Sequence, residues 1–121
     1  MSASAWIAVA VLGSLAAMAR FVLGGWISAR SSSHLPLGTL AVNISGALLL
    51  GLVTGIALSG DALVLIGAAT IGSYTTFSSW MLDTRRLHEQ GRTAMAVANV
   101  LISLAFGLAA VALGRAIGDW L

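Results

Sequence analysis

One eight-residue segment holds most of the side chains that could do chemistry. Residues 72–79 read Gly-Ser-Tyr-Thr-Thr-Phe-Ser-Ser, so five Ser or Thr hydroxyls gather within an otherwise apolar stretch. In a membrane helix, one or two such hydroxyls simply bond back to the preceding turn. This higher density predicts that the helix is broken near mid-membrane, between Gly72 and Thr76. Freed carbonyls there could bind a cation, and a Ser or Thr side chain could cap the second half of the helix.

The other polar side chains in apolar stretches are neutral. Asn43 lies about a third of the way through the second stretch, and Asn99 and Ser103, four residues apart, share one face of the last. An isolated asparagine in a membrane helix usually serves as hydrogen-bonding glue between helices. Several on different helices also fit a track of hydrogen-bond donors without fixed charge, and both interpretations remain open at this point.

Charged and reactive groups argue against two other classes of protein. Every carboxylate is expected at a span end or in a connection: Asp61, Asp83, Glu89 and Asp119. A proton-coupled drug antiporter needs a carboxylate embedded in the membrane, so that class is disfavoured. The chain has no cysteine, and His34 and His88 have no helical partner four residues away. We find no set of nucleophile, base and orienting residue, and therefore expect no enzyme.

These residues must be positioned by membrane helices. Of the 121 residues, 59% are hydrophobic and 8% charged, against roughly 45–50% and 25% in soluble domains. Residues 35–60, 62–82 and 93–114 contain no Asp, Glu, Lys or Arg, and residues 5–29 contain only Arg20. Each stretch reaches the roughly 20 residues needed to cross a bilayer. The sequence predicts an all-α membrane protein, a single domain of four transmembrane helices over residues 1–121.

Composition also bears on partners. The net charge is only +2 and there is no basic cluster, so we do not expect nucleic acid as a partner. We expect the lipid bilayer to surround the protein. Gly51 and Gly55 form a small-xxx-small pair that lets helices approach closely. Four helices enclose little space, which indicates that a functional pathway needs a second subunit.

Three motifs, in order, resemble the Fluc (CrcB) family of fluoride channels. They are Gly13 through Arg20 to Phe21, the segment Pro-Leu-Gly-Thr-Leu-Ala-Val-Asn-Ile-Ser-Gly at 36–46, and Thr-Thr-Phe-Ser at 75–78. The resemblance implies a fluoride-specific channel in the cell inner or plasma membrane that exports fluoride passively and lowers its cytoplasmic level. It also implies an antiparallel dimer with two pores at the subunit interface and a structural sodium ion, Na⁺, where the two broken helices cross.

The resemblance assigns roles to particular residues. Backbone carbonyls of Gly72 and Thr75 match the sodium ligands, and Arg20 matches an arginine near the pore vestibule. Asn43 matches the pore asparagine, whose amide can donate to fluoride. Phe77 offers the positive edge of its ring to an anion. The full pore set that we expect is Asn43, Thr76, Phe77, Ser78, Trp80, Asn99 and Ser103.

Three positions depart from the family pattern. Trp80 stands where a second phenylalanine is usual, Asn99 where many members have tyrosine, and Ser73 where a second glycine precedes the Thr-Thr pair. These changes affect the second half of the predicted pore lining. They leave Asn43, Phe77 and the break itself untouched.

The arginines are distributed unevenly. With four spans, one side of the membrane carries Arg30, Arg85, Arg86 and Arg92, and the other carries only Arg115. By the positive-inside rule this bias predicts one fixed orientation with both termini outward. The partner would then be an oppositely inserted homologue, with this chain as one subunit of a heterodimeric channel. A homodimer and a noncatalytic membrane assembly subunit are the alternatives.

Overall fold

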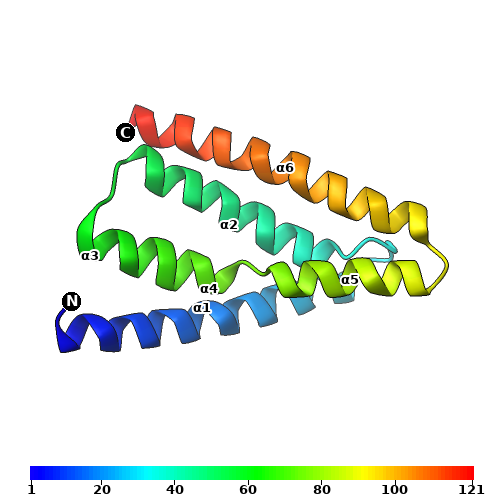
Figure 1. The fold of residues 1–121 in the computed structure, drawn as a ribbon, viewed down its shortest axis with the longest axis horizontal. Helices are drawn as coiled ribbons and strands as arrows, with labels where there is room; N and C mark the ends of the chain where they lie inside the picture. Colours follow the sequence, from blue (N-terminus) through cyan, green and yellow to red (C-terminus); the bar gives the residue numbers. More distant parts are fainter.

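The computed structural model describes all residues 1–121, and every regular element in it is helical (Figure 1). Three passes are single helices: α1 (Ala3–Arg30), α2 (Leu37–Gly55) and α6 (Thr93–Trp120). The remaining pass, Gly60–Glu89, consists of α3 (Gly60–Ala62), the π-helix η1 (Leu63–Ile71), α4 (Gly72–Tyr74) and α5 (Phe77–Glu89). All four passes are long and apolar enough to cross a membrane. This confirms the predicted four-helix architecture with a broken third pass.

The four passes alternate in direction along the chain. In Figure 1, α2 and α6 run from right to left, whereas α1 and the Gly60–Glu89 pass run from left to right. The first and third connections therefore lie at one end of the bundle, and both termini and the second connection lie at the other. Short connections force this arrangement, because only neighbouring antiparallel passes can be joined by so few residues.

Glycines allow α2 and α6 to pack backbone against backbone. A Cβ on Gly51 would collide with the Val111 carbonyl oxygen, and one on Gly114 would collide with that of Leu48. Gly55 and Gly118 also approach the facing backbone closely one turn further on, against the carbonyl oxygens of Arg115 and Leu52. In lipid, such close contact supplies the dispersion energy that holds helices together. The predicted packing role of Gly51 and Gly55 is confirmed, and it requires a matching glycine pair on α6.

The small residues of α1 act in the same way. A Cβ on Gly38 of α2 would collide with the Gly24 carbonyl oxygen of α1, and a Cβ on Gly13 would come within 3.2 Å of Ser73 Oγ. α1 therefore lies directly against both α2 and the polar cluster of the third pass. This contact is what brings Arg20 close to the break.

Little of this chain is enclosed by the chain itself. Only 16 of its 121 residues are buried, while Phe21 is 81% exposed and Leu108 is 72% exposed. Exposed side chains of this size and number need lipid or another subunit to cover them.

Candidate anion pathway

The third pass breaks at Thr75 and Thr76. Both residues have extended backbone angles, with φ −77° and ψ 158° at Thr75 and φ −147° and ψ 118° at Thr76. α5 then begins at Phe77, and Thr76 Oγ1 caps it by accepting a hydrogen bond of 3.1 Å from Ser79 N–H. The prediction of a break near Thr76 with a hydroxyl cap is confirmed.

Asn43 holds the break in place with both ends of its amide. Its Nδ2 donates to the Thr76 carbonyl oxygen at 2.9 Å, and its Oδ1 accepts from Thr76 N–H at 2.8 Å. Thr76 is 8% exposed, so its backbone groups could not turn to water if this pairing were lost. One Nδ2 hydrogen of Asn43 remains for another acceptor. The sequence left a hydrogen-bonding role between helices open for Asn43, but it did not identify Thr76 as the partner.

Two side-chain hydrogen bonds, one to Asn43 and one to the Thr76 hydroxyl, release backbone oxygens on either side of the break. In a continuous helix the Gly72 carbonyl would accept from Thr76 N–H, which instead bonds Asn43. The Thr75 carbonyl would accept from Ser79 N–H, which instead bonds the Thr76 hydroxyl. Neutral carbonyl oxygens are ligands suited to a hard cation. The carbonyl oxygens of Gly72 and Thr75 are therefore suitable ligands for the sodium ion that the family resemblance implies.

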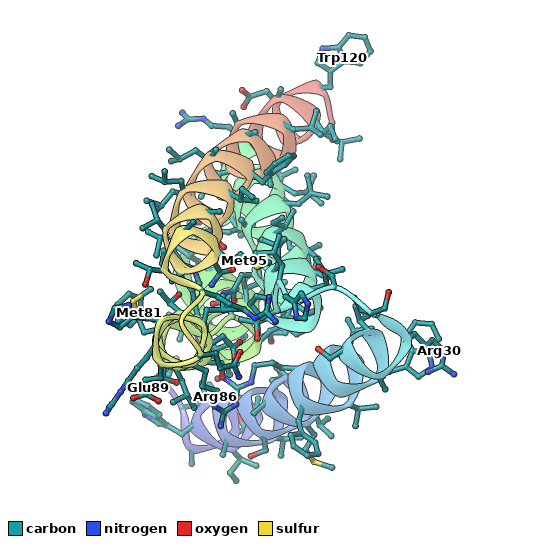
Figure 2. The ribbon with its side chains drawn as sticks, turned by 90° about the vertical axis from the view of Figure 1, so that its right-hand side faces the viewer. Arg30, Met81, Arg86, Glu89, Met95 and Trp120 are labelled. Carbon is teal, nitrogen blue, oxygen red and sulfur yellow. The ribbon has the colours of Figure 1, made fainter.

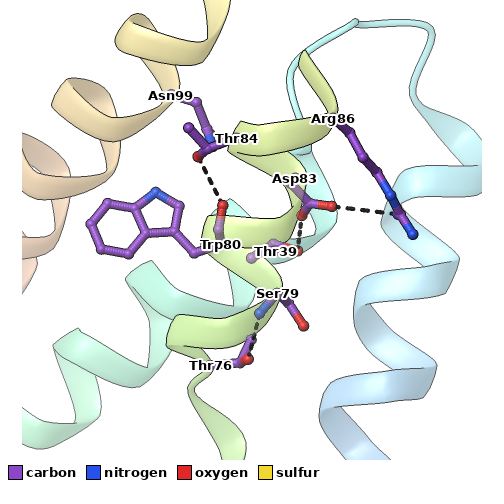
Figure 3. A network of polar contacts seen from close by, with 8 residues as sticks. All are labelled: Thr39, Thr76, Ser79, Trp80, Asp83, Thr84, Arg86 and Asn99. Carbon is purple, nitrogen blue, oxygen red and sulfur yellow. Dashed lines mark hydrogen bonds and ion pairs between the residues drawn. The ribbon is translucent and has the colours of Figure 1, made fainter. Parts of the chain in front are cut away.

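A polar cavity of about 430 Å³ lies between α1, α2 and α5, beside the break. Its lining includes Arg20, Thr39, Thr76, Ser79, Asp83 and Arg86. Thr39 Oγ1 donates to Asp83 Oδ2 at 2.8 Å, and the other carboxylate oxygen lies 3.9 Å from Arg86 Nη1 (Figure 3). We refer to this cavity as the vestibule. Arg20, which the family resemblance assigns to a pore vestibule, is among its lining residues.

Asp83 directly follows the charge-free residues 62–82. It lies in the helical Gly60–Glu89 pass, and its side chain is only 21% exposed because it lines the vestibule. The sequence spacing indicates a shared polar face. Ser79, Asp83 and Arg86 are separated by four and three residues, which places them on one side of the helix. Thr39 likewise precedes Asn43 by four residues, on the same face of α2.

Phe77 and Trp80 form an aromatic pair at the start of α5. Their ring centroids are 5.8 Å apart with an interplanar angle of 84°, an edge-to-face arrangement. Phe77 is 69% exposed, whereas the Trp80 indole Nε1 is buried without a hydrogen-bond partner. In Figure 3 the Trp80 side chain extends from α5 on the side away from Arg86 and the vestibule.

Asn99 and Ser103 are not brought to the vestibule. Asn99 is 2% exposed, and its Nδ2 donates to Thr84 Oγ1 at 2.9 Å, which in turn donates to the Trp80 carbonyl at 2.8 Å. Within this chain Asn99 therefore ties α6 to α5, the packing role that was kept open for a membrane asparagine. Ser103 is partly buried one turn further along α6. Ser78 stays near the break, with its Oγ 3.3 Å from Thr76 Oγ1.

Together these features define a class: a four-helix membrane protein with a polar break in its third pass and an arginine-lined vestibule beside it. A family model described as CrcB-like protein, Camphor Resistance (CrcB), matches residues 7–115. The chain belongs to this family, as its motifs predicted. It is a multi-pass protein of the plasma membrane.

Curated relatives cover nearly the whole chain. A protein of Mycolicibacterium paratuberculosis named "Fluoride-specific ion channel FluC 2" is 47% identical over 110 residues, covering 91% of this chain and 90% of the relative. Symbiobacterium thermophilum has two relatives, named FluC 1 and FluC 2. They are 40% and 48% identical, covering 93% and 88% of this chain and 96% and 91% of the relatives.

Proposed function

We propose that this chain is a channel subunit that lets fluoride leave the cell down its gradient and so lowers cytoplasmic fluoride. The observation that carries the proposal is the vestibule, which has arginines on its walls and ends on Thr76 at the break. The names of the relatives, all fluoride-specific ion channels, support the choice of anion. They also agree with the expectation that the chain is not an enzyme.

The vestibule is suited to collecting an anion. Arg20 and Arg86 supply positive potential, which raises the local concentration of anions in a narrow cavity. Asp83 accepts from Thr39 and lies beside Arg86, so it orients these groups and keeps the net charge low enough for the anion to move on. Binding that is too strong would hold the ion and stop conduction.

From the vestibule, donors near the break would take over from water. The second Nδ2 hydrogen of Asn43 and the hydroxyls of Thr76 and Ser78 are candidates, followed by the ring edge of Phe77. Phe77 is largely uncovered in the single chain, so a second subunit would have to close the pore around it. Trp80, Asn99 and Ser103 remain proposed lining residues that need this partner to complete a pathway.

Sodium would be a structural ion in this assembly and would not travel with fluoride. The Gly72 and Thr75 carbonyls of two subunits would hold it at the crossing of their broken passes. When bound, the ion supplies positive charge that satisfies backbone oxygens left without helical donors in a dry environment.

The partner would insert with the opposite orientation. Arg30, Arg85, Arg86 and Arg92 lie on one side of the membrane and Arg115 on the other, which favours one orientation for this chain. The FluC 1 and FluC 2 pair of one organism supports a paired homologue as the partner. A homodimer would instead require this chain to insert both ways.

The test is a flux assay on liposomes that contain the purified protein. We expect a fluoride gradient to dissipate while a chloride gradient of equal size stays nearly intact, because a narrow track of donors excludes the larger halide. An accessory subunit would conduct only after an oppositely inserted homologue is added. Equal fluoride and chloride fluxes, or no flux with and without the homologue, would overturn the proposal.

A further inference from the structure

Two adjoining cavities of opposite character lie where α1 ends and α2 begins. The first, of about 590 Å³, is apolar and runs between α1, α2 and α6, with Leu40, Ile44 and Leu48 on its wall. The second, of about 510 Å³, is polar and is formed by Trp26, Arg30 and the serines at 31–33. Both are lined by Ile27 and Leu37, so they adjoin, and we refer to the two together as the amphipathic groove.

The polar end of this groove has the chemistry of an anion site. Arg30 is the sole charged residue in the lining of either cavity, and its guanidinium lies 4.0 Å above the Trp26 ring. Figure 2 places Arg30 at the far end of α1, away from α5. Ser31 and Ser33 accept backbone N–H bonds through Oγ, which leaves their hydroxyl hydrogens free to donate.

The apolar end has the length of one lipid leaflet. Leu37 and Leu48 lie eleven residues apart on α2, which corresponds to about 16 Å at 1.5 Å per residue. Half of a bilayer's hydrocarbon core measures about 15 Å. Trp26 and Arg30 line the polar end of the groove. Tryptophan and arginine are common residues at the membrane interface.

We propose that this groove binds an anionic phospholipid. Its phosphate would contact Arg30 and the serine hydroxyls, and one acyl chain would fill the apolar cavity. Arg30 lies on the side of the membrane that carries most of the arginines, which the positive-inside rule assigns to the cytoplasm. The cytoplasmic leaflet is the one rich in anionic lipids, so the charge of the site matches its surroundings.

Helix geometry favours a lipid over a second copy of the chain as the occupant. Gly46 faces the break, because a Cβ added there would collide with Thr75 Cγ2. Leu37, which lines the groove, lies nine residues before Gly46 on α2. Nine residues are two and a half turns, so the groove and the break lie on opposite sides of this helix. If two subunits meet at the break, a step that rests on the proposed function, the groove faces the bilayer.

Native mass spectrometry of the purified full chain, mixed with equal amounts of phosphatidylglycerol and phosphatidylcholine, tests the site. We expect about fivefold preferential retention of phosphatidylglycerol, the factor that one arginine near a membrane surface supplies. Arg30→Gln should reduce the preference to about one, whereas Arg115→Gln, the same charge change at the opposite end, should leave it intact. Ile44→Trp should fill the groove and lower retention of both lipids.

The outcomes separate this proposal from the channel proposal. An unchanged lipid preference in Arg30→Gln, or no preference in the wild type, overturns the lipid site. Loss of dimer in Ile44→Trp with lipid retention unaffected shows that a second copy covers the groove, which also overturns it. A protein that retains phosphatidylglycerol as expected but carries no fluoride keeps the lipid site and counts only against the channel.

Discussion

Replacing Asn43 gives the sharpest test, because this side chain serves both the break and the proposed pore. Asn43→Ala removes both bonds to Thr76, leaving a buried N–H and a buried carbonyl unpaired. Each unsatisfied group costs about 1–3 kcal/mol, so the variant should lose about 2–6 kcal/mol of stability. Asn43→Asp keeps the acceptor for Thr76 N–H but places a carboxylate oxygen against the Thr76 carbonyl.

The aspartate variant should therefore assemble and fail to conduct. It loses one bond, a cost of about 1–3 kcal/mol, and the repulsion between its carboxylate and the Thr76 carbonyl oxygen adds to this cost. Its negative charge would lie where an anion must pass, and the remaining N–H donor would be gone. We expect fluoride flux to fall to background in liposomes while the variant elutes from a sizing column at the same position as the wild type.

Two measurements and one control complete the experiment. Urea titrations followed by tryptophan fluorescence rank the variants, and hydrogen exchange reports whether the Thr76 amide is exposed earlier in Asn43→Ala. Ser45→Ala, on the same helix, removes a contact with the Tyr74 hydroxyl but leaves the clamp, so it should keep slow exchange at Thr76. Wild-type flux in Asn43→Asp would remove Asn43 from the pore, and unchanged exchange in Asn43→Ala would refute the clamp.

Four further predictions concern the sodium site, the helix packing, the vestibule arginine and the orientation in the membrane. Replacing all sodium in the buffers by N-methylglucamine should lower the urea midpoint of the wild-type protein, and an unchanged midpoint would contradict a structural sodium ion. Gly114→Val should cost about 1–3 kcal/mol or more in the same titration, because its Cβ would collide with the Leu48 carbonyl; Gly25→Ala, where no atom lies within 4 Å, should change little. Arg20→Gln should slow fluoride flux most at low ionic strength, and a salt-independent loss would argue against electrostatic attraction. Reporter fusions at the carboxyl terminus should report one side of the membrane, and equal populations on both sides would restore the homodimer.

The sequence predicted the fold well because membrane helices depend on length and apolarity, which can be counted along the chain. The break was also predictable, since five hydroxyls within residues 72–79 have no place in an ordinary lipid-facing helix. The π-helical turn geometry of Leu63–Ile71 left no such signal. Its residues are uniformly apolar or small, so no polar periodicity distinguishes 3.6 residues per turn from a wider helix.

Partners across the bundle could not be predicted from composition. The Asn43–Thr76 pair spans 33 positions and the Thr39–Asp83 pair spans 44, and both depend on how α2 packs against the third pass. For Asn99, the sequence pattern suggested a role, but the partner again depends on packing. The face that it shares with Ser103 suggested a polar track, but Thr84, on the neighbouring α5, takes its amide N–H.

The clamp also bears on how a channel of this kind could discriminate between halides. Under the proposed function, Asn43 cannot follow an ion along the pore, because moving its amide would release both Thr76 bonds inside the protein. It would therefore present its free N–H hydrogen at one fixed position. A donor fixed in this way forms a stronger hydrogen bond to a small anion than to a larger one. The larger anion cannot approach all the donors at once. The hydrogen bonds that hold the break would thus serve selectivity as well as stability.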